Sequence, residues 1–193
     1  MILRNLAQLA AMLLFLSACG TPTPNPEVTG SDAVKRLEAG LMAMGPDIDP
    51  EEAARAAEIA YSYTRVLAEE YEIVDPPLVH NTKVNMGLKP RGLCWHWAED
   101  MQKRFEAEDF QTLDVLRAIA TAPFRIDHST VLLSPDGGDL SNAMVIDPWR
   151  FGGQLYWGMA PEDDRYAWRP QLEVLAEIRA RKIRKGELPA PIQ

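Results

Sequence analysis

Cysteine and histidine are both scarce in this sequence, whose 193 residues contain two cysteines and three histidines. Basic residues are outnumbered by acidic ones, 20 against 28. The resulting net charge of −8 argues against a nucleic-acid partner, because a nucleic-acid backbone requires a positive surface. No apolar run reaches the ~20 residues that cross a bilayer as a helix. The composition is otherwise that of a globular protein, and the length fits one domain.

The chain opens with a segment typical of exported proteins. Arg4 gives a positive start, a short apolar run covers residues 6–16, and small residues follow it. The tetrapeptide Leu16-Ser17-Ala18-Cys19 resembles a bacterial lipobox. That resemblance implies that Cys19 is lipidated, for example with palmitate, and becomes the mature amino terminus. An ordinary signal peptide that contains a cysteine is the alternative.

The lipobox divides the chain into three expected parts. Residues 1–18 are the expected lipoprotein signal peptide, residues 19–30 a flexible tether and residues 31–193 a single domain. Several acyl chains would hold the protein stably at a membrane, which makes the lipid bilayer a partner. Gly20 replaces the aspartate of a common inner-membrane retention signal. We therefore expect a cell-envelope protein, and in a Gram-negative cell an outer-membrane lipoprotein that faces the periplasm.

The domain has both helical and strand-like segments. Four segments have helical spacing or helix-start residues: 31–44, 50–73, 94–107 and 170–185. Asp49 is the expected N-cap of the second, with Pro50 at the first helical position. The segment 78–92 has no strong period and is expected to form an ordered loop. From Thr112 onward the pattern becomes strand-like, so the fold class expected is α+β.

Cys94 lies in the stretch RGLCWHWAED, where it comes two residues after Gly92 and opens the third expected helix. Free N–H groups and the positive end of the helix dipole stabilise a thiolate at such a position. A nucleophilic thiol also needs a general base. His96 lies about 200° around the helix from Cys94, and His80 falls in the expected loop. The sequence does not place His80 relative to Cys94, and His128, which lies on an expected hairpin strand, is the candidate base.

A hairpin brings His128 near a carboxylate. In the segment FRIDHSTVLLSPDGGDLSNAMVIDPWRF, two β-branched runs flank a turn-forming PDGGD. A turn centred between Gly137 and Gly138 pairs residues whose numbers sum to 275. His128 then lies opposite Asp147, on one face of the sheet, with Cβ atoms ~4.5–5.5 Å apart. Asp127 would point to the other face.

These segments resemble the catalytic core of the transglutaminase-like superfamily, a papain-like group of cysteine enzymes. GLCWHWA is similar to its cysteine segment, while DHSTVLL and VIDPW are similar to its histidine and aspartate strands. The resemblance covers residues 92–149. It implies a helix that carries the nucleophile, packed on an antiparallel sheet, with additional amino-terminal helices and a carboxy-terminal helix. Leu93 and Ser129 depart from the residues common in the family.

The resemblance also implies a mechanism. Cys94 would attack an amide or ester carbonyl, His128 would move the proton, and Asp147 would orient His128, as in other triads. The backbone N–H of Cys94 and the side chain of Asn85 are oxyanion candidates, with Asn81 and a tryptophan indole also open. No cofactor is implied. The substrate would be a peptide or protein, with peptidoglycan peptides suggested by location alone.

Each of these residues also has a structural alternative. Cys94 can be an inert core thiol, His128 a hydrogen-bonded strand histidine, and Asp147 a turn former before Pro148. His96 and Asp100 share a helical face, but two ligands are too few for zinc, so no metal site is expected. Three functions remain open: a thiol acyl-transfer enzyme, an inactive transglutaminase-like binding module, and a structural lipoprotein.

Overall fold

The computed structural model describes residues 30–121 and 127–189. The expected signal peptide, the lipidation candidate Cys19 and the tether lie outside these residues. Within them the helices are α2 (Ser31–Met42), α3 (Pro50–Glu70), α4 (Pro77–Asn85), α5 (Cys94–Glu106) and α6 (Gln171–Arg184). The strands are β1 (Leu113–Ala120), β2 (His128–Pro135), β3 (Met144–Asp147), β4 (Tyr156–Met159) and β5 (Arg169–Pro170). The fold is α+β, as the sequence predicts.

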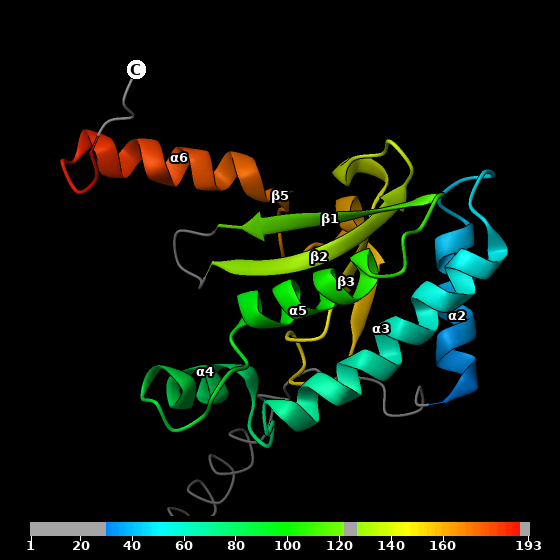
Figure 1. Cartoon of the computed structure of the whole chain (residues 1–193), viewed down its shortest axis with the longest axis horizontal. Helices are drawn as coiled ribbons and strands as arrows, with labels where there is room; N and C mark the ends of the chain where they lie inside the picture. The colour runs from blue at the N-terminus through cyan, green and yellow to red at the C-terminus, as the bar shows by residue number, and fades with distance from the viewer. Residues whose placement is uncertain (1–29, 122–126, 190–193) are drawn as a thin grey trace, which may run out of the picture. The chain divides into compact units, whose positions relative to one another are not determined.

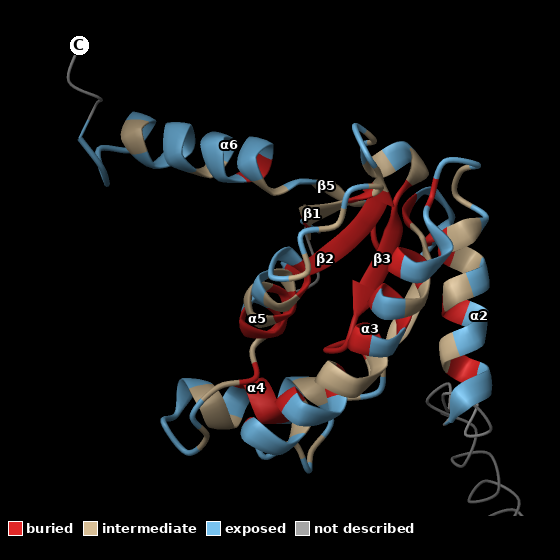
Figure 2. Cartoon of the chain, turned by 45° about the vertical axis from the view of Figure 1, so that its right-hand side comes forward, coloured by how far each residue is buried: buried red, intermediate tan, exposed pale blue. Residues whose placement is uncertain are grey.

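The five described strands form one antiparallel sheet in the order β4-β3-β2-β1-β5. One face carries Val131, Leu133 and Ile146, which pack with buried residues of α2, α3 and α5. The opposite face carries Leu132 and Val145, which pack under the chain that follows β4. Both β2 and β3 are buried along most of their length (Figure 2). Strands β2 and β3 therefore form the buried centre of the part of the domain that the structure describes.

The long helix α3 starts where its sequence predicts. The carboxylate of Asp49 accepts hydrogen bonds from the backbone N–H groups of Glu51 and Glu52, at 2.8 and 3.0 Å. These bonds satisfy two donors that have no partner within the helix. Ala53, Ala56 and other small residues of one helical face are fully buried. Small side chains let α3 pack closely beside α2 and α5 (Figure 1).

Two expectations about the chain before Cys94 are corrected. Helix α3 ends at Glu70, three residues before the expected end. Residues 78–92 are not all loop, because α4 covers Pro77–Asn85. Pro77 occupies the first turn, where its missing N–H costs nothing. The short helix has no amphipathic pattern for sequence reasoning to detect, since only His80 and Asn81 are buried in it.

The hairpin forms, but its register differs from the expected one. Val131 pairs with Ile146 and Leu132 with Val145, so partner numbers sum to 277 and not 275. The turn is longer because Asp139 caps a short 3₁₀ helix, η2 (Leu140–Asn142), through the N–H of Ser141. A shift of two in the sum preserves which face each residue occupies, because side chains alternate with a period of two.

The carboxy-terminal helix α6 follows β5 and is mostly exposed. Val174 is its only buried residue. Its last turns carry Arg181, Lys182 and Arg184, which suit the negative end of the helix dipole. Neither α6 nor any other described helix combines the length and apolar character needed to cross a membrane.

Candidate active site

Cys94 is the first residue of α5, as the sequence predicts. Its side chain is nearly buried, with 8% of the residue exposed, and packs with Leu67, Trp97 and Trp149. The sulfur lies 3.8 Å from the backbone oxygen of Asp127. No described residue accepts a hydrogen bond from the backbone N–H of Cys94. That N–H is therefore free to donate to a bound group.

The backbone before Cys94 is held tightly. Gly92 has φ +120°, a conformation that favours glycine, and its Cβ position is filled by the ring of His80 at 2.3 Å. The Nε2 of His80 hydrogen-bonds the carbonyl of Arg91 at 2.8 Å. The indole N–H of Trp97 donates to the carbonyl of Gly92 at 3.1 Å. Together these contacts fix the direction in which α5 leaves the loop.

His96 acts on the same turn. Its Nδ1 accepts hydrogen bonds from the N–H groups of Gly92 and Leu93, at 3.1 and 3.2 Å. Burial and the neighbouring Arg91 lower the pKa of His96, which keeps this nitrogen an acceptor. His96 therefore caps the start of α5. It is not engaged with Asp147, and its hydrogen bonds give it a structural role.

His128 and Asp147 lie at the ends of adjacent strands and are each 1% exposed. The Nε2 of His128 is 2.7 Å from Oδ2 of Asp147, which confirms the expected hydrogen bond. The Nδ1 of His128 has no hydrogen-bond partner among the described residues. Its ring is enclosed by Trp149, Tyr166 and Trp168, with ring centroids 4.6 to 5.4 Å apart.

The pKa values of this pair are set by opposing effects. Burial alone would lower the pKa of His128, but the Asp147 carboxylate and the Cys94 thiol together raise it to about 9. Burial would raise the pKa of Asp147, but His128 and Arg150 outweigh it and lower the pKa. At neutral pH the pair is thus an imidazolium and a carboxylate. The sulfur of Cys94 is 3.8 Å from the backbone oxygen of Asp127, the residue before His128, so the structure brings the three predicted residues to one region.

Arg150 is a member of this cluster that the sequence did not reveal. Its Nε donates to Oδ2 of Asp147 at 2.9 Å, and its backbone N–H donates to Oδ1 at 3.1 Å. The other guanidinium nitrogens bind both carboxylate oxygens of Asp163. Its guanidinium carbon lies 3.5 Å from the centroid of the Tyr156 ring. The only sequence signal was the position of Arg150, three residues after Asp147.

Asp163 continues the chain of contacts. It accepts hydrogen bonds from the indole N–H of Trp168 at 2.9 Å and from the backbone N–H of Arg165 at 3.1 Å. Burial would raise its pKa, but Arg150 and Trp168 outweigh it and keep the pKa low. A buried run of alternating charge thus extends from His128 through Asp147 and Arg150 to Asp163. Such a run orders side chains because each buried charge has a partner.

The oxyanion candidates differ in their positions. Asn85 is exposed at the last position of α4, and no hydrogen bond or ion pair among the described residues joins it to the three central residues. Asn81 is buried and accepts a hydrogen bond from the indole N–H of Trp149 at 3.1 Å. Four of the five tryptophan indoles donate to protein atoms. Trp95, half-exposed beside Cys94, is the indole for which the described residues supply no acceptor.

The described residues contain no group of three or more histidine, cysteine, aspartate or glutamate side chains arranged to hold a metal ion. Comparison with known proteins gives no match: no family model, no curated protein and no solved structure corresponds to the chain. The candidate function therefore depends on the geometry of the site and on the residues themselves.

Proposed function

We propose that this protein is a thiol-dependent acyl-transfer enzyme that acts on amide bonds of peptides or proteins. The observation that supports this most directly is the hydrogen-bonded His128–Asp147 pair beside Cys94. A buried imidazole that binds a carboxylate through one nitrogen, and leaves the other toward a thiol, is the arrangement that activates a nucleophile. Membership of the transglutaminase-like superfamily belongs to the same proposal.

The proposed reaction has two steps. In the first, the Cys94 thiolate forms a bond to the substrate carbonyl carbon, the C–N bond breaks, and the proton of the His128 imidazolium passes to the leaving amine. In the second, water attacks the thioester carbon and gives one proton to His128. The C–S bond then breaks, which releases the carboxylic acid and restores the thiolate. An amine in place of water gives a new amide. Hydrolysis and transamidation would thus use the same residues of the protein.

Asp147 and the backbone of Cys94 have supporting roles in this scheme. Asp147 holds the ring of His128 in one orientation and stabilises its positive charge. The free N–H of Cys94 can donate to the oxyanion, which is the largest source of stabilisation in many acyl transfers. The second donor is taken to be the backbone N–H or the indole N–H of Trp95, because the N–H groups of Gly92, Leu93, His96 and Trp97 already have acceptors. These are the donors nearest Cys94 in the chain.

The cellular setting forms a second part of the proposal. Lipidation at Cys19 would hold the enzyme at the cell envelope, on the outer membrane in a Gram-negative cell. There it would meet peptide or protein substrates, peptidoglycan peptides among them. The low exposure of Cys94, 8%, favours an inactive transglutaminase-like binding module as the second candidate.

The two candidates differ in covalent chemistry. Incubation with p-nitrophenyl acetate should release nitrophenol in a burst and leave one acetyl group on Cys94, detected by intact and peptide mass spectrometry. Cys94→Ser should abolish the burst, and Asp147→Asn should lower its rate by roughly 10²–10⁴-fold, because the orienting carboxylate is lost. A folded protein that never acquires the acetyl group would be the binding module.

A further inference from the structure

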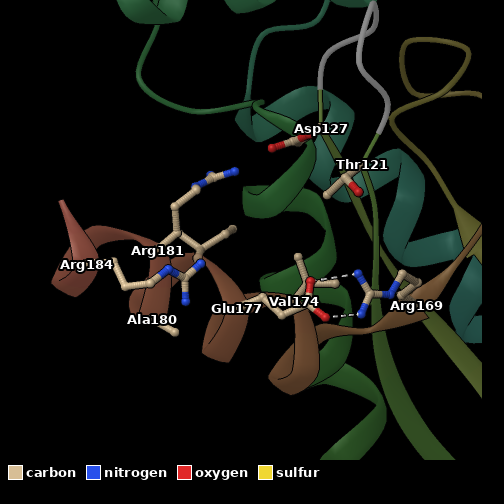
Figure 3. A pocket seen from close by; sticks show the side chains of 9 residues that line it. Thr121, Asp127, Arg169, Val174, Glu177, Ala180, Arg181 and Arg184 are labelled. Atoms are coloured by element: carbon tan, nitrogen blue, oxygen red, sulfur yellow. Dashed lines mark hydrogen bonds and ion pairs between the residues drawn. The ribbon is translucent and has the colours of Figure 1, made fainter.

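A cavity of about 600 Å³ lies between α6 and the ends of β1 and β2. Thr121 and Asp127 border it on the sheet side, and Arg181 and Arg184 extend from α6 on the other side (Figure 3). Asp127 also connects the cavity to the candidate active site, because its backbone oxygen is 3.8 Å from the sulfur of Cys94. A substrate held at Cys94 would therefore have this cavity as its neighbour.

Positively charged side chains outnumber negatively charged ones among the described residues that line the cavity. Arg169 and Glu177 form an ion pair across it, with nitrogen-to-oxygen distances of 2.9 and 2.5 Å, and so balance each other (Figure 3). Arg181 and Arg184 have no ion pair with any described carboxylate, and Asp127 is the one remaining acid among the described residues that line the cavity. The cavity is thus cationic within a chain whose net charge is −8.

We propose that this cavity is a substrate subsite that binds a carboxylate, and that the enzyme prefers peptides bearing a free carboxylate close to the bond that is cleaved. This inference deepens the function proposed above and rests on it. Guanidinium groups recognise carboxylates through paired, charge-assisted hydrogen bonds. Arg181 and Arg184 are one turn apart on α6, so both can reach one bound group.

Two alkylating reagents test the charge of the cavity through Cys94 itself. Iodoacetate and iodoacetamide form the same S–C bond and release the same iodide, but only iodoacetate carries a carboxylate. In the full chain, the ratio of their rates at Cys94 should fall by roughly tenfold in the double variant Arg181→Gln/Arg184→Gln, because the attraction for the carboxylate is lost. His128 stays in both proteins, so its charge does not affect the comparison.

Arg179→Gln is the matched control, since Arg179 is an exposed arginine of the same helix that does not line the cavity. The rate ratio should stay unchanged in this variant. A ratio that is equal in all three proteins would overturn the inference, as would an equal fall in the double variant and the control. In the latter case the overall field of α6, and not a subsite, would attract the reagent.

A binding measurement separates this inference from the proposed function. Calorimetry compares N-acetyl-alanyl-alanine with its carboxamide on the full chain that carries Cys94→Ser. The free acid should bind roughly tenfold more tightly than the amide, and the double arginine variant should remove the difference. Equal affinity for the two peptides, or no binding by either, would overturn the subsite. If the free acid binds selectively but Cys94 of the wild-type protein is unreactive, the proposed enzyme function would be overturned and the proposed carboxylate subsite would stand.

Discussion

At the scale of single residues, the site is a line of alternating buried charges. His128, Asp147, Arg150 and Asp163 each contact the next, and all are less than a tenth exposed. Such an arrangement is stable only when every charge keeps its partner, because an isolated buried charge loses its hydration without compensation. Arg150 is the central member, since it contacts both carboxylates. Its hydrogen bonds hold the carboxylate of Asp147 in place.

The variant Arg150→Met should destabilise the protein by about 3–5 kcal/mol, because it leaves the buried carboxylate of Asp163 without its cation and the carboxylate of Asp147 with His128 alone. Denaturant unfolding at pH 7 measures the loss. Arg55→Met is the matched control: Arg55 is 45% exposed and pairs with Glu52 and Glu108, so its loss should cost less than about 1 kcal/mol. Equal effects of the two variants would contradict the buried role of Arg150.

Stability should also depend on pH through His128. Its folded pKa of about 9 lies above the ordinary value of 6.5, so its stabilising contribution is complete below about pH 6.5 and disappears as the pH rises through about 9. The contribution is on the order of 3 kcal/mol, at ~1.4 kcal/mol for each pKa unit. The free energy of unfolding between pH 6 and pH 10 should fall by that much more in the wild type than in His128→Gln. Parallel profiles would refute this assignment.

The sequence predicted the residues that carry chemical signatures and missed those that support them. Cys94, His128 and Asp147 can be predicted from the sequence, because a helix start and a hairpin place their side chains by simple periodicity. Arg150 and Asp163 cannot be predicted in this way. The chain that joins them after β3 has no regular period that would place one side chain against the other. Asn85 was a candidate by residue type alone, and the structure leaves it exposed.

At the scale of elements, the starts of α3 and α5 were predictable, whereas helix α4 and the length of the turn after β2 were not. Asp49-Pro50 and Gly92-Leu93-Cys94 mark the starts of α3 and α5 because capping and turn chemistry are local. The turn between β2 and β3 is longer than the sequence predicts, because it contains the capped η2, and partner numbers therefore sum to 277 and not 275. The predicted His128–Asp147 hydrogen bond is still present, because a register shift of two leaves both residues on the same face of the sheet.

The start of α5 gives an element-scale prediction. Gly92→Ala should destabilise the protein by about 2 kcal/mol or more, because φ +120° strains an L-residue and the added Cβ would meet His80. Thermal unfolding followed by circular dichroism measures this change. Gly87→Ala is the control: Gly87 also has positive φ but no atom near its Cβ position, so only the backbone strain remains. If Gly92→Ala loses no more stability than Gly87→Ala, the prediction is wrong, and the ring of His80 can move away from the added Cβ without destabilising the protein.

At the scale of the whole molecule, the three central residues come from three different elements. Cys94 opens α5, His128 opens β2 and Asp147 closes β3. The hydrophobic core behind them, formed by α2, α3 and α5 against the sheet, fixes these ends relative to one another. The site is thus supported by rigid elements, as precise chemistry requires. The proposed lipid at Cys19 would then decide where this chemistry takes place.

The anchor predicts a change of location without a change of fold. Cys19→Ala should remove labelling by a palmitate analogue and release the protein from the membrane fraction. Metabolic labelling followed by fractionation measures both. Cys94→Ala serves as the control, since loss of the other cysteine should leave labelling and location unchanged. Equal labelling of the Cys19→Ala protein and the wild type would disprove the lipoprotein proposal.

The most direct test of the central claim is the rate at which iodoacetamide alkylates Cys94 in the folded protein, measured from pH 5 to pH 9. Reaction at neutral pH should be rapid in the wild type and roughly tenfold slower in His128→Ala, because the imidazolium that stabilises the thiolate is lost. Lys103→Ala, an exposed change on the same helix, should have no effect. Denaturant should give no acceleration at pH 7. A Cys94 that reacts only after unfolding would be a core thiol, and the enzyme proposal would fail.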